Sequence, residues 1–358
     1  MPVRPRLKPI AVVRRPAEVI LVGRAMQLTY LADPDGSVAA LLQVLAQGAH
    51  PVAGLPAAMR ERGFTVTEAD MAAAVAALDE VGVLLRADTD AGLDPDTLRR
   101  HESNLRFYDL FAGLQRPGAA FHRAMRDADV LLLGAGGMGS GVLQSLVGLG
   151  AGRVRLVDFD VVEEKNLSRQ FAYGRADVGR AKADAARDWA ARYSPGTTAV
   201  EAVREQGGRR GHDPPAGRGR VRRGVRHRLP NDVHLLVNEA CFELGVPFVT
   251  GGLQYSTLFY WSVEPGVSPC RLCLELNRAD EGAAQQVEQT VMMSADFVNR
   301  ATGPVAQLLA GFVALEAGRY LTRTDPPVAA ATYHTFDLAD AMRMTVEPWP
   351  HNPGCPLC

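Results

Sequence analysis

The chain has 358 residues, a length that predicts roughly two domains. Its 39 basic and 40 acidic residues leave a net charge of −1, which excludes a polybasic nucleic-acid binder and a long acidic tail. Hydrophobic residues make up 47% and charged residues 22%, as in ordinary soluble globular proteins. Lysine is rare: the three lysines are Lys8, Lys165 and Lys182, and a compact ammonium in so arginine-rich a chain suggests a specific role.

The sequence predicts neither export nor a membrane span. Residues 1–15 are broken by prolines and lack the apolar stretch of a signal peptide. Residues 130–152 carry no charge over about the length of a membrane span. They nevertheless contain eight glycines, which favour a strand, a turn and a packed helix instead. We therefore expect a cytoplasmic protein.

The first ninety residues predict a small module. Strand-like runs are expected at residues 11–13, 18–22 and 26–31, helices at 37–47 and 68–81, and a closing strand at 83–85. Thr67 is a good cap for the second helix. The pattern predicts a winged-helix-like α+β domain over residues 1–90. After a linker near residues 87–96, a helix over 99–114 should lead into the domain 91–358.

A glycine-rich loop opens the larger domain. The apolar run Val130–Leu133 predicts a buried parallel strand, and a helix is expected over Ser140–Val147. Between them lies Gly134-Ala-Gly-Gly-Met-Gly139, whose glycines allow a sharp turn and let a phosphate approach the free N–H groups of the helix. The next strand ends at Asp158, nineteen residues after Gly139, where a carboxylate can accept hydrogen bonds from a ribose. Alternating strands and helices predict a Rossmann-like α/β domain with a mostly parallel sheet.

The loop alone does not distinguish NAD from ATP, but the segment that follows it does. Asp158-Phe-Asp160 precedes Asn166-Leu-Ser-Arg-Gln170, Asp177-Val-Gly179 and Lys182. With these spacings, residues 129–358 resemble the ThiF/MoeB/HesA superfamily, the bacterial relatives of ubiquitin-activating enzymes. The resemblance implies ATP-dependent adenylation of a C-terminal carboxylate.

The residues suit that chemistry. The attacking carboxylate is already an anion, so the enzyme must position two anions and neutralise the charge on the phosphate oxygens. Arg169 offers a planar fork, Lys182 a point charge and Asn166 hydrogen bonds. The resemblance implies that Asp158 holds the ribose and that Arg169 and Lys182 are the catalytic phosphate contacts. The expected nucleotide set is Gly134, Gly136, Gly137, Met138, Gly139, Asp158, Asp160, Asn166, Arg169, Gln170 and Lys182.

Four of the five cysteines form two Cys-x-x-Cys pairs, Cys270/Cys273 and Cys355/Cys358. Four thiolates at such spacing predict a closed, structural zinc site, although 81 residues separate the pairs and the fold must bring them together. Relatives place their second pair in the same context as Asn352-Pro-Gly-Cys355. Unpaired thiols or a redox dithiol are the alternatives. Cys241 is expected to be a small hydrophobe, which argues against a covalent cysteine relay.

One stretch departs from the family. Relatives carry an apolar strand here that ends in an acidic motif, whose Asp binds magnesium. Residues 206–228 instead contain eight arginines among glycines and prolines, and neither Asp213 nor Asp232 has the expected context. The stretch is interpreted as a flexible basic loop, a phosphate or nucleic-acid patch, or a local reading-frame slip. We favour the slip, which resequencing of the coding DNA would test.

The front module suggests the substrate. It has no clearly basic recognition helix, so DNA binding is disfavoured. Such modules precede the microcin-type peptide adenylating enzymes, in which a hairpin edge binds a precursor peptide as an added strand. A dimer-stabilising appendage is the alternative. The resemblance further implies a homodimer in which an arginine of the preceding helix reaches the partner's ATP; Arg106 is the candidate, with Arg99 and Arg100 as rivals.

The sequence therefore predicts an adenylyltransferase using ATP, magnesium and structural zinc on a precursor peptide or a small carrier protein. A role in tailoring ribosomal peptides is preferred over sulfur-carrier adenylation, which would not need the front module. A zinc-containing NAD dehydrogenase would leave Asn166, Arg169 and Lys182 without a role. A non-catalytic peptide-binding scaffold gains weight if residues 206–228 are genuine.

Overall fold

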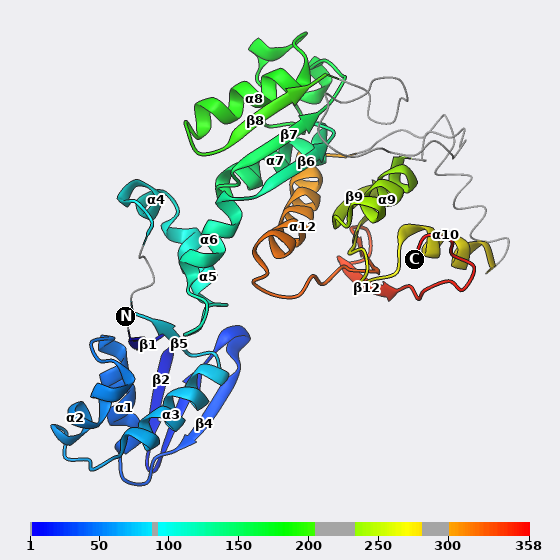
Figure 1. The fold of residues 1–358 in the computed structure, drawn as a ribbon. Helices are drawn as coiled ribbons and strands as arrows, with labels where there is room; N and C mark the ends of the chain where they lie inside the picture. The colour runs from blue at the N-terminus through cyan, green and yellow to red at the C-terminus, as the bar shows by residue number, and fades with distance from the viewer. Residues whose placement is uncertain (1, 88–91, 205–232, 281–300) are drawn as a thin grey trace. The chain divides into compact units, whose positions relative to one another are not determined.

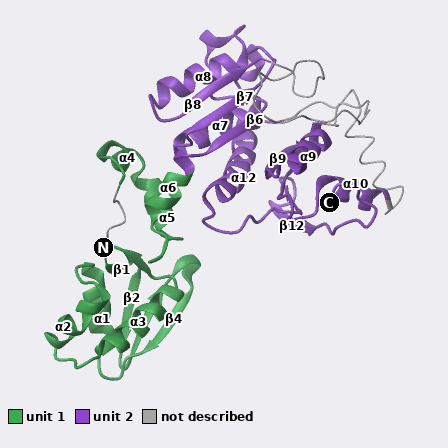
Figure 2. Cartoon of the chain, in the orientation of Figure 1, with its two compact units in different colours: residues 1–124 green, residues 125–358 purple. Residues whose placement is uncertain are grey.

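The computed structural model describes residues 2–87, 92–204, 233–280 and 301–358. The chain divides into two compact units, Met1–Ala124 and Met125–Cys358, coloured separately in Figure 2. In the described residues, no helix is both long and apolar enough to cross a membrane.

In the described part of unit 1 the strands form two antiparallel sheets. The larger has the order β2–β3–β4, and the smaller pairs β1 with β5. The strands are β1 (Pro5–Leu7), β2 (Ala11–Arg15), β3 (Glu18–Val22), β4 (Leu28–Ala32) and β5 (Leu84–Arg86). The closing strand expected from the sequence is β5, and Leu85 lies opposite Arg6 of β1 rather than beside the hairpin.

Three helices cover the core side of this module. They are α1 (Ser37–Gln47), α2 (Leu55–Arg60) and α3 (Glu68–Glu80). The 3₁₀ turn η2 (Val52–Gly54) lies between α1 and α2, and the 3₁₀ turn η1 (Arg24–Met26) lies between β3 and β4. Thr67 caps α3 as expected: its hydroxyl accepts from the Asp70 N–H at 3.1 Å, and the Asp70 carboxylate accepts from the Thr67 N–H at 2.9 Å. Leu21 of β3 and Leu45 of α1 are buried together in the core.

The expected helix over residues 99–114 is two helices, α4 (Pro95–Arg100) and α5 (Glu102–Asp109), and α6 (Gly118–Arg126) follows. The break falls at His101, whose backbone leaves the helical region (φ −104°, ψ 18°). Helix α5 ends early because the next residues are bound by the front module. The Lys8 ammonium donates to the Leu110 carbonyl at 3.2 Å, and the Leu114 N–H donates to the Asp79 carboxylate at 3.0 Å.

Unit 2 begins with a parallel sheet of order β6–β7–β8. Its strands are β6 (Asp129–Leu133), β7 (Arg153–Val157) and β8 (Ala199–Val203); its helices are α7 (Gly137–Leu149) and α8 (Lys182–Tyr193), with the 3₁₀ turns η3 (Glu164–Asn166) and η4 (Arg175–Asp177). Burial of β6 on both faces was expected, but Leu131 is 61% exposed. Its neighbours Arg155 and Glu201 form an ion pair of 3.1 Å, so this face of the sheet is polar.

The strands in the second half of unit 2 form an antiparallel sheet, so the parallel pairing expected from the sequence is found in the sheet β6–β7–β8. The order is β12–β11–β10–β9, with β9 (Phe248–Gln254), β10 (Thr257–Val263), β11 (Thr332–Asp337) and β12 (Arg343–Pro348). The reason is local: β9 and β10 are separated by Tyr255 and Ser256, and a two-residue connection forces antiparallel pairing. The helices here are α9 (Val233–Leu244), α10 (Arg271–Asp280) and α12 (Gly303–Thr322).

Helix α12 packs against α7 (Figure 1). Small residues allow this close approach, because a methyl group added at Gly137 would lie 3.3 Å from Ala306 Cβ, and one added at Gly141 would lie 2.7 Å from Ala310 Cβ. Two glycines and two alanines, each pair four residues apart, thus face each other across the helix contact. The contact holds α12 beside the N-terminus of α7.

We expect Gly141→Ala to destabilise the protein by about 1–3 kcal/mol, because the added methyl group overpacks the contact with Ala310. The matched control is Gly148→Ala on the same helix, where a methyl group would meet nothing within 4 Å. That change should stabilise the helix by up to about 1 kcal/mol. Thermal and urea unfolding of both variants measure the difference; equal shifts in the two variants would contradict the packing argument.

Candidate nucleotide pocket and zinc centre

A pocket of about 390 Å³ opens at the N-terminus of α7. Seven of the eleven nucleotide residues expected from the sequence line it: Gly134, Gly136, Gly137, Met138, Gly139, Arg169 and Gln170. The helix begins inside the glycine loop, at Gly137, so its free N–H groups lie at the pocket. A helix end of this kind favours an anion.

The glycines of the loop have different tasks. Gly134 has φ +93°, a left-handed conformation that disfavours a side chain. A methyl group at Gly139 would lie 1.9 Å from the Gly134 carbonyl oxygen, so only glycine lets the loop fold back on the helix. Gly137 serves the α12 contact described above. The loop geometry therefore depends on glycine at three positions for three separate reasons.

Asp158 lies at the carboxyl end of β7 and is 8% exposed. One carboxylate oxygen accepts from the Ala135 N–H at 2.6 Å and the other from the Asp160 N–H at 2.8 Å. Each oxygen has a further lone pair that can accept from a hydroxyl group. The acid thus ties the glycine loop to the end of β7, and it is not among the residues that line the pocket.

Asn166 organises the segment that carries Arg169. It is 3% exposed, and its side-chain oxygen accepts from the Glu163 N–H at 3.0 Å. Its backbone carbonyl accepts from the N–H groups of Arg169 and Gln170, both at 3.0 Å. In the structure Asn166 therefore positions the next two residues, and it does not line the pocket itself. The Gln170 side chain is 2% exposed, and its amide oxygen has no hydrogen-bond partner among the described residues.

Lys182 begins α8, and its ammonium donates to the Asp160 carboxylate at 2.9 Å. The lysine side chain is 7% exposed and Asp160 is 51% exposed. A buried ammonium needs such a partner. Neither residue is among those lining the pocket. The ammonium expected to contact the phosphates is instead paired with Asp160, which lies two residues after Asp158 in the chain.

The opposite wall of the pocket was not predicted from the sequence. That wall is contributed by β9, by α12 and by Ala301, which lies just before α12 in the chain. Its residues on β9 are Gly251, Gly252 and Leu253, and those on α12 are Val305, Ala306 and Leu309. The glycine pair on β9 was the available signal, because a methyl group at Gly251 would lie 2.7 Å from the Phe259 carbonyl oxygen and 2.9 Å from Leu309. This wall is largely apolar, which suits a base or another flat ring.

The four paired cysteines meet, as the sequence predicts. Their sulfur atoms all lie within 4.8 Å of one another. Adjacent pairs are separated by 3.4 Å (Cys273–Cys358), 3.5 Å (Cys270–Cys355), 3.8 Å (Cys355–Cys358) and 3.9 Å (Cys270–Cys273). A tetrahedral zinc with bonds of about 2.3 Å requires sulfurs about 3.8 Å apart. The residues fit zinc, and such a closed site would stabilise the fold rather than react.

Side chains away from the sulfurs hold the second pair in place. The Asn277 amide on α10 donates to the Pro350 carbonyl at 3.0 Å and accepts from the Asn352 amide at 2.7 Å. The Asn352 side-chain oxygen in turn accepts from the Gly354 N–H at 2.8 Å. The Trp349 indole donates to the Cys270 carbonyl at 3.2 Å. This network joins the two pairs across the chain.

Two further candidates from the sequence, Cys241 and Arg106, are not among the residues that line the pocket or form the cysteine cluster. Cys241 is half-buried on α9, and burial raises the pKa of its thiol to about 11, so it is a poor nucleophile. Arg106 lies on α5 in unit 1 and pairs with Glu102 at 2.5 Å. Residues 206–228, Asp213 and Asp232 lie outside the described residues.

We expect Cys270→Ser to abolish tight zinc binding, because zinc prefers four thiolates at a site of this kind. The control is Cys241→Ser, which should keep one zinc per chain. Metal analysis and the absorption of the cobalt-substituted protein measure the difference. Full zinc content in Cys270→Ser, or its loss in Cys241→Ser, would contradict the assignment.

A Rossmann-like unit with this pocket and a four-cysteine centre defines a class of nucleotide-binding protein. A family model for the ThiF family matches residues 108–215 and 230–357. The chain belongs to the ThiF family.

Individual relatives of the chain are named as adenylyltransferases. The molybdopterin-synthase adenylyltransferase of Salmonella typhimurium is 29% identical over 248 residues, which cover 66% of this chain and 88% of that protein. MoeZ of Mycobacterium tuberculosis, a probable adenylyltransferase/sulfurtransferase, is 41% identical over 98 residues, and this match spans only 27% of the chain and 23% of MoeZ.

Among solved structures, E. coli MccB crystallised with AMPCPP and MccA has a TM-score of 0.74. The alignment covers 99% of both chains at 16% identity, so it shows a shared fold.

Proposed function

We propose that this protein is an ATP-dependent adenylyltransferase that activates the C-terminal carboxylate of a peptide or small carrier protein. The observation that carries the proposal is the pocket at the N-terminus of α7, where the glycine loop and Arg169 face an apolar wall. Membership of the ThiF family and the adenylyltransferases among its relatives support ATP as the substrate.

The reaction needs position and charge rather than a base. The acceptor carboxylate attacks the α-phosphorus of ATP, an O–P bond forms, and the bond to the β-phosphate breaks to release pyrophosphate. Loop N–H groups and the α7 dipole stabilise the phosphate oxygens, Asp158 holds the ribose, and Arg169 and Lys182 neutralise the developing charge. The four paired cysteines would hold zinc, which would stabilise the fold and take no part in the reaction. Magnesium would accompany ATP, and we assign it no residue.

We expect Arg169→Ala and Lys182→Ala each to lower ATP–pyrophosphate exchange by about 10²-fold, the scale for losing one charge-stabilising donor. The control is Arg175→Ala, an arginine 87% exposed and paired with Glu164 on the same segment. It should exchange like the wild type.

Exchange is measured with radiolabelled pyrophosphate in the presence of candidate peptides or carrier proteins. Unchanged exchange in both Arg169→Ala and Lys182→Ala would reject the assigned roles. Tight NAD binding without ATP binding would favour a dehydrogenase, and peptide binding without exchange would favour a scaffold.

We propose a precursor peptide as the preferred acceptor, in the tailoring of a ribosomal peptide. The fold shared with MccB, which was crystallised with MccA, supports a peptide. A sulfur carrier protein is the second candidate, supported by the molybdopterin-synthase adenylyltransferase relative. The exchange assay separates them, because only the true acceptor stimulates it.

We further propose that the front module, residues 1–90, recognises the peptide. In the described part of unit 1, β4 pairs on one side with β3 and is an edge of its sheet. An extended peptide can add to such an edge through backbone hydrogen bonds. The outward side chains of β4 are apolar, with Leu28 47% and Tyr30 58% exposed.

We expect a bound peptide to slow amide hydrogen exchange in β4, because an added strand protects the edge N–H groups. Strand β2 forms the other edge of the same sheet and serves as the internal control. Mass spectrometry of the full chain with and without peptide measures both strands. Protection of β2 instead of β4, or of neither, would contradict strand addition at β4.

We also propose a homodimer in which Arg106 contributes to the partner's site. Its side chain is 77% exposed and is held by Glu102 alone among the ion pairs of the described residues. An exposed pair of this type is weak, so the arginine can exchange partners at little cost.

A further inference from the structure

Ala135, the second residue of the glycine loop, has both of its backbone polar groups bound by side chains from outside the loop. Its N–H donates to Asp158 at 2.6 Å, and its carbonyl accepts from the Tyr173 hydroxyl at 2.8 Å. Ala135 is fully buried, and Asp158 and Tyr173 are 8% and 7% exposed. Water competes little for either hydrogen bond at such burial.

The carbonyl bond matters for the neighbouring peptide group. In a planar trans peptide, the C=O of one residue and the N–H of the next point in opposite directions. Tyr173 therefore fixes the orientation of the Gly136 N–H when it holds the Ala135 carbonyl. Gly136 lines the pocket and caps α7, so this N–H belongs to the end of the helix that favours an anion.

A loop so rich in glycine does not maintain this orientation by itself. Glycine accepts many backbone conformations, and a rotated peptide would turn the Ala135 carbonyl oxygen towards the ligand's oxygens. Burial, together with the nearby charges of Asp158 and Asp177, raises the pKa of Tyr173. The hydroxyl consequently remains a protonated donor at physiological pH.

We propose that Tyr173 is a positioning residue for the phosphate end of the nucleotide: it fixes the loop peptide whose N–H faces the phosphates. The inference rests on the proposed function, since it takes ATP as the ligand. It also implies that the base and ribose are bound independently of the Tyr173 hydroxyl.

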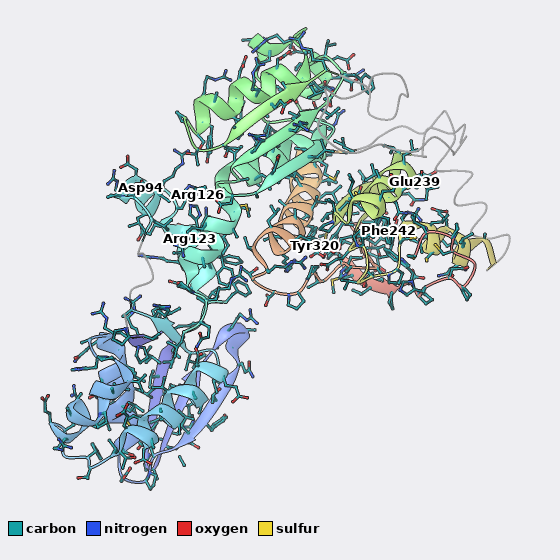
Figure 3. The ribbon with its side chains drawn as sticks, in the orientation of Figure 1. Asp94, Arg123, Arg126, Glu239, Phe242 and Tyr320 are labelled. Atoms are coloured by element: carbon teal, nitrogen blue, oxygen red, sulfur yellow. The ribbon has the colours of Figure 1, made fainter. Side chains whose placement is uncertain are left out.

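The test compares Tyr173→Phe with Tyr320→Phe. Phenylalanine fills the same space and removes only the hydroxyl in both variants. Tyr320 lies on α12 (labelled in Figure 3), and its hydroxyl makes a hydrogen bond of 3.0 Å with Ser262. It lies eleven residues beyond the pocket residue Leu309, about 16 Å along the helix.

Calorimetric titrations of the full-length protein with ATP and with adenosine, plus thermal melting, give the readouts. We expect Tyr173→Phe to weaken ATP binding about tenfold, the equivalent of one net hydrogen bond, and to change adenosine binding less than about twofold. Tyr320→Phe should lower the melting temperature without changing either affinity.

Wild-type ATP affinity in a folded Tyr173→Phe variant, or equal losses for ATP and adenosine, would overturn the inference. So would a loss of ATP affinity in Tyr320→Phe as large as that in Tyr173→Phe. If the wild type binds ATP but exchanges no pyrophosphate, the proposed function fails while the titrations still decide the role of Tyr173. If the wild type does not bind ATP, both fail.

Discussion

The close contact between α7 and α12 is the constraint on which the pocket depends. One wall of the pocket comes from the loop that opens α7, and α12 contributes Val305, Ala306 and Leu309 to the opposite wall. The two helices come this near because Gly137 and Gly141 present no side chain to Ala306 and Ala310. Glycine in this segment therefore serves two purposes, since the same run that frees the loop backbone also admits the second helix.

The second half of the unit connects that helix to the cysteine centre. Glu316 of α12 is fully buried, and its carboxylate accepts from the Ser262 hydroxyl at 3.0 Å and the Ala329 N–H at 2.8 Å. Ser262 lies on β10, which leads to Cys270, and Ala329 precedes β11, which leads towards Cys355. A fully bonded buried carboxylate is costly to disturb, so α12 and both cysteine pairs share one rigid support.

Features set by neighbouring residues could be predicted from the sequence, and those set by distant residues could not. The strand–loop–helix pattern around Gly134 and the capping of α3 by Thr67 follow from residues close together in the sequence, and both are predicted from it. The wall from β9 and α12 was missed because nothing in the residues near Gly134 indicates that Leu253 or Val305 will face them. The early end of α5 was missed for a similar reason: Leu110 and Leu114 are bound by Lys8 and Asp79 of the front module.

The strand β6 shows a third kind of limit. Its sequence is apolar throughout, which is typical of a strand covered on both faces, yet Leu131 and Leu133 are 61% and 41% exposed. Composition indicates which side chains of a strand could be buried, but the packing of neighbouring elements decides which are buried.

Residues 206–228 lie outside the described part of the chain, so the frame-slip interpretation stays a prediction.

The ion pair between Lys182 and Asp160 has a consequence for selectivity. Any anion that is to use this ammonium must compete with a carboxylate already 2.9 Å away. A singly charged solute such as chloride or acetate gains little by that exchange, because it replaces one unit of negative charge with another. A polyphosphate brings several charges at once and would compete better with Asp160 for the ammonium. If Lys182 contacts the nucleotide, as the proposed function has it, the ion pair would therefore favour ligands of higher charge.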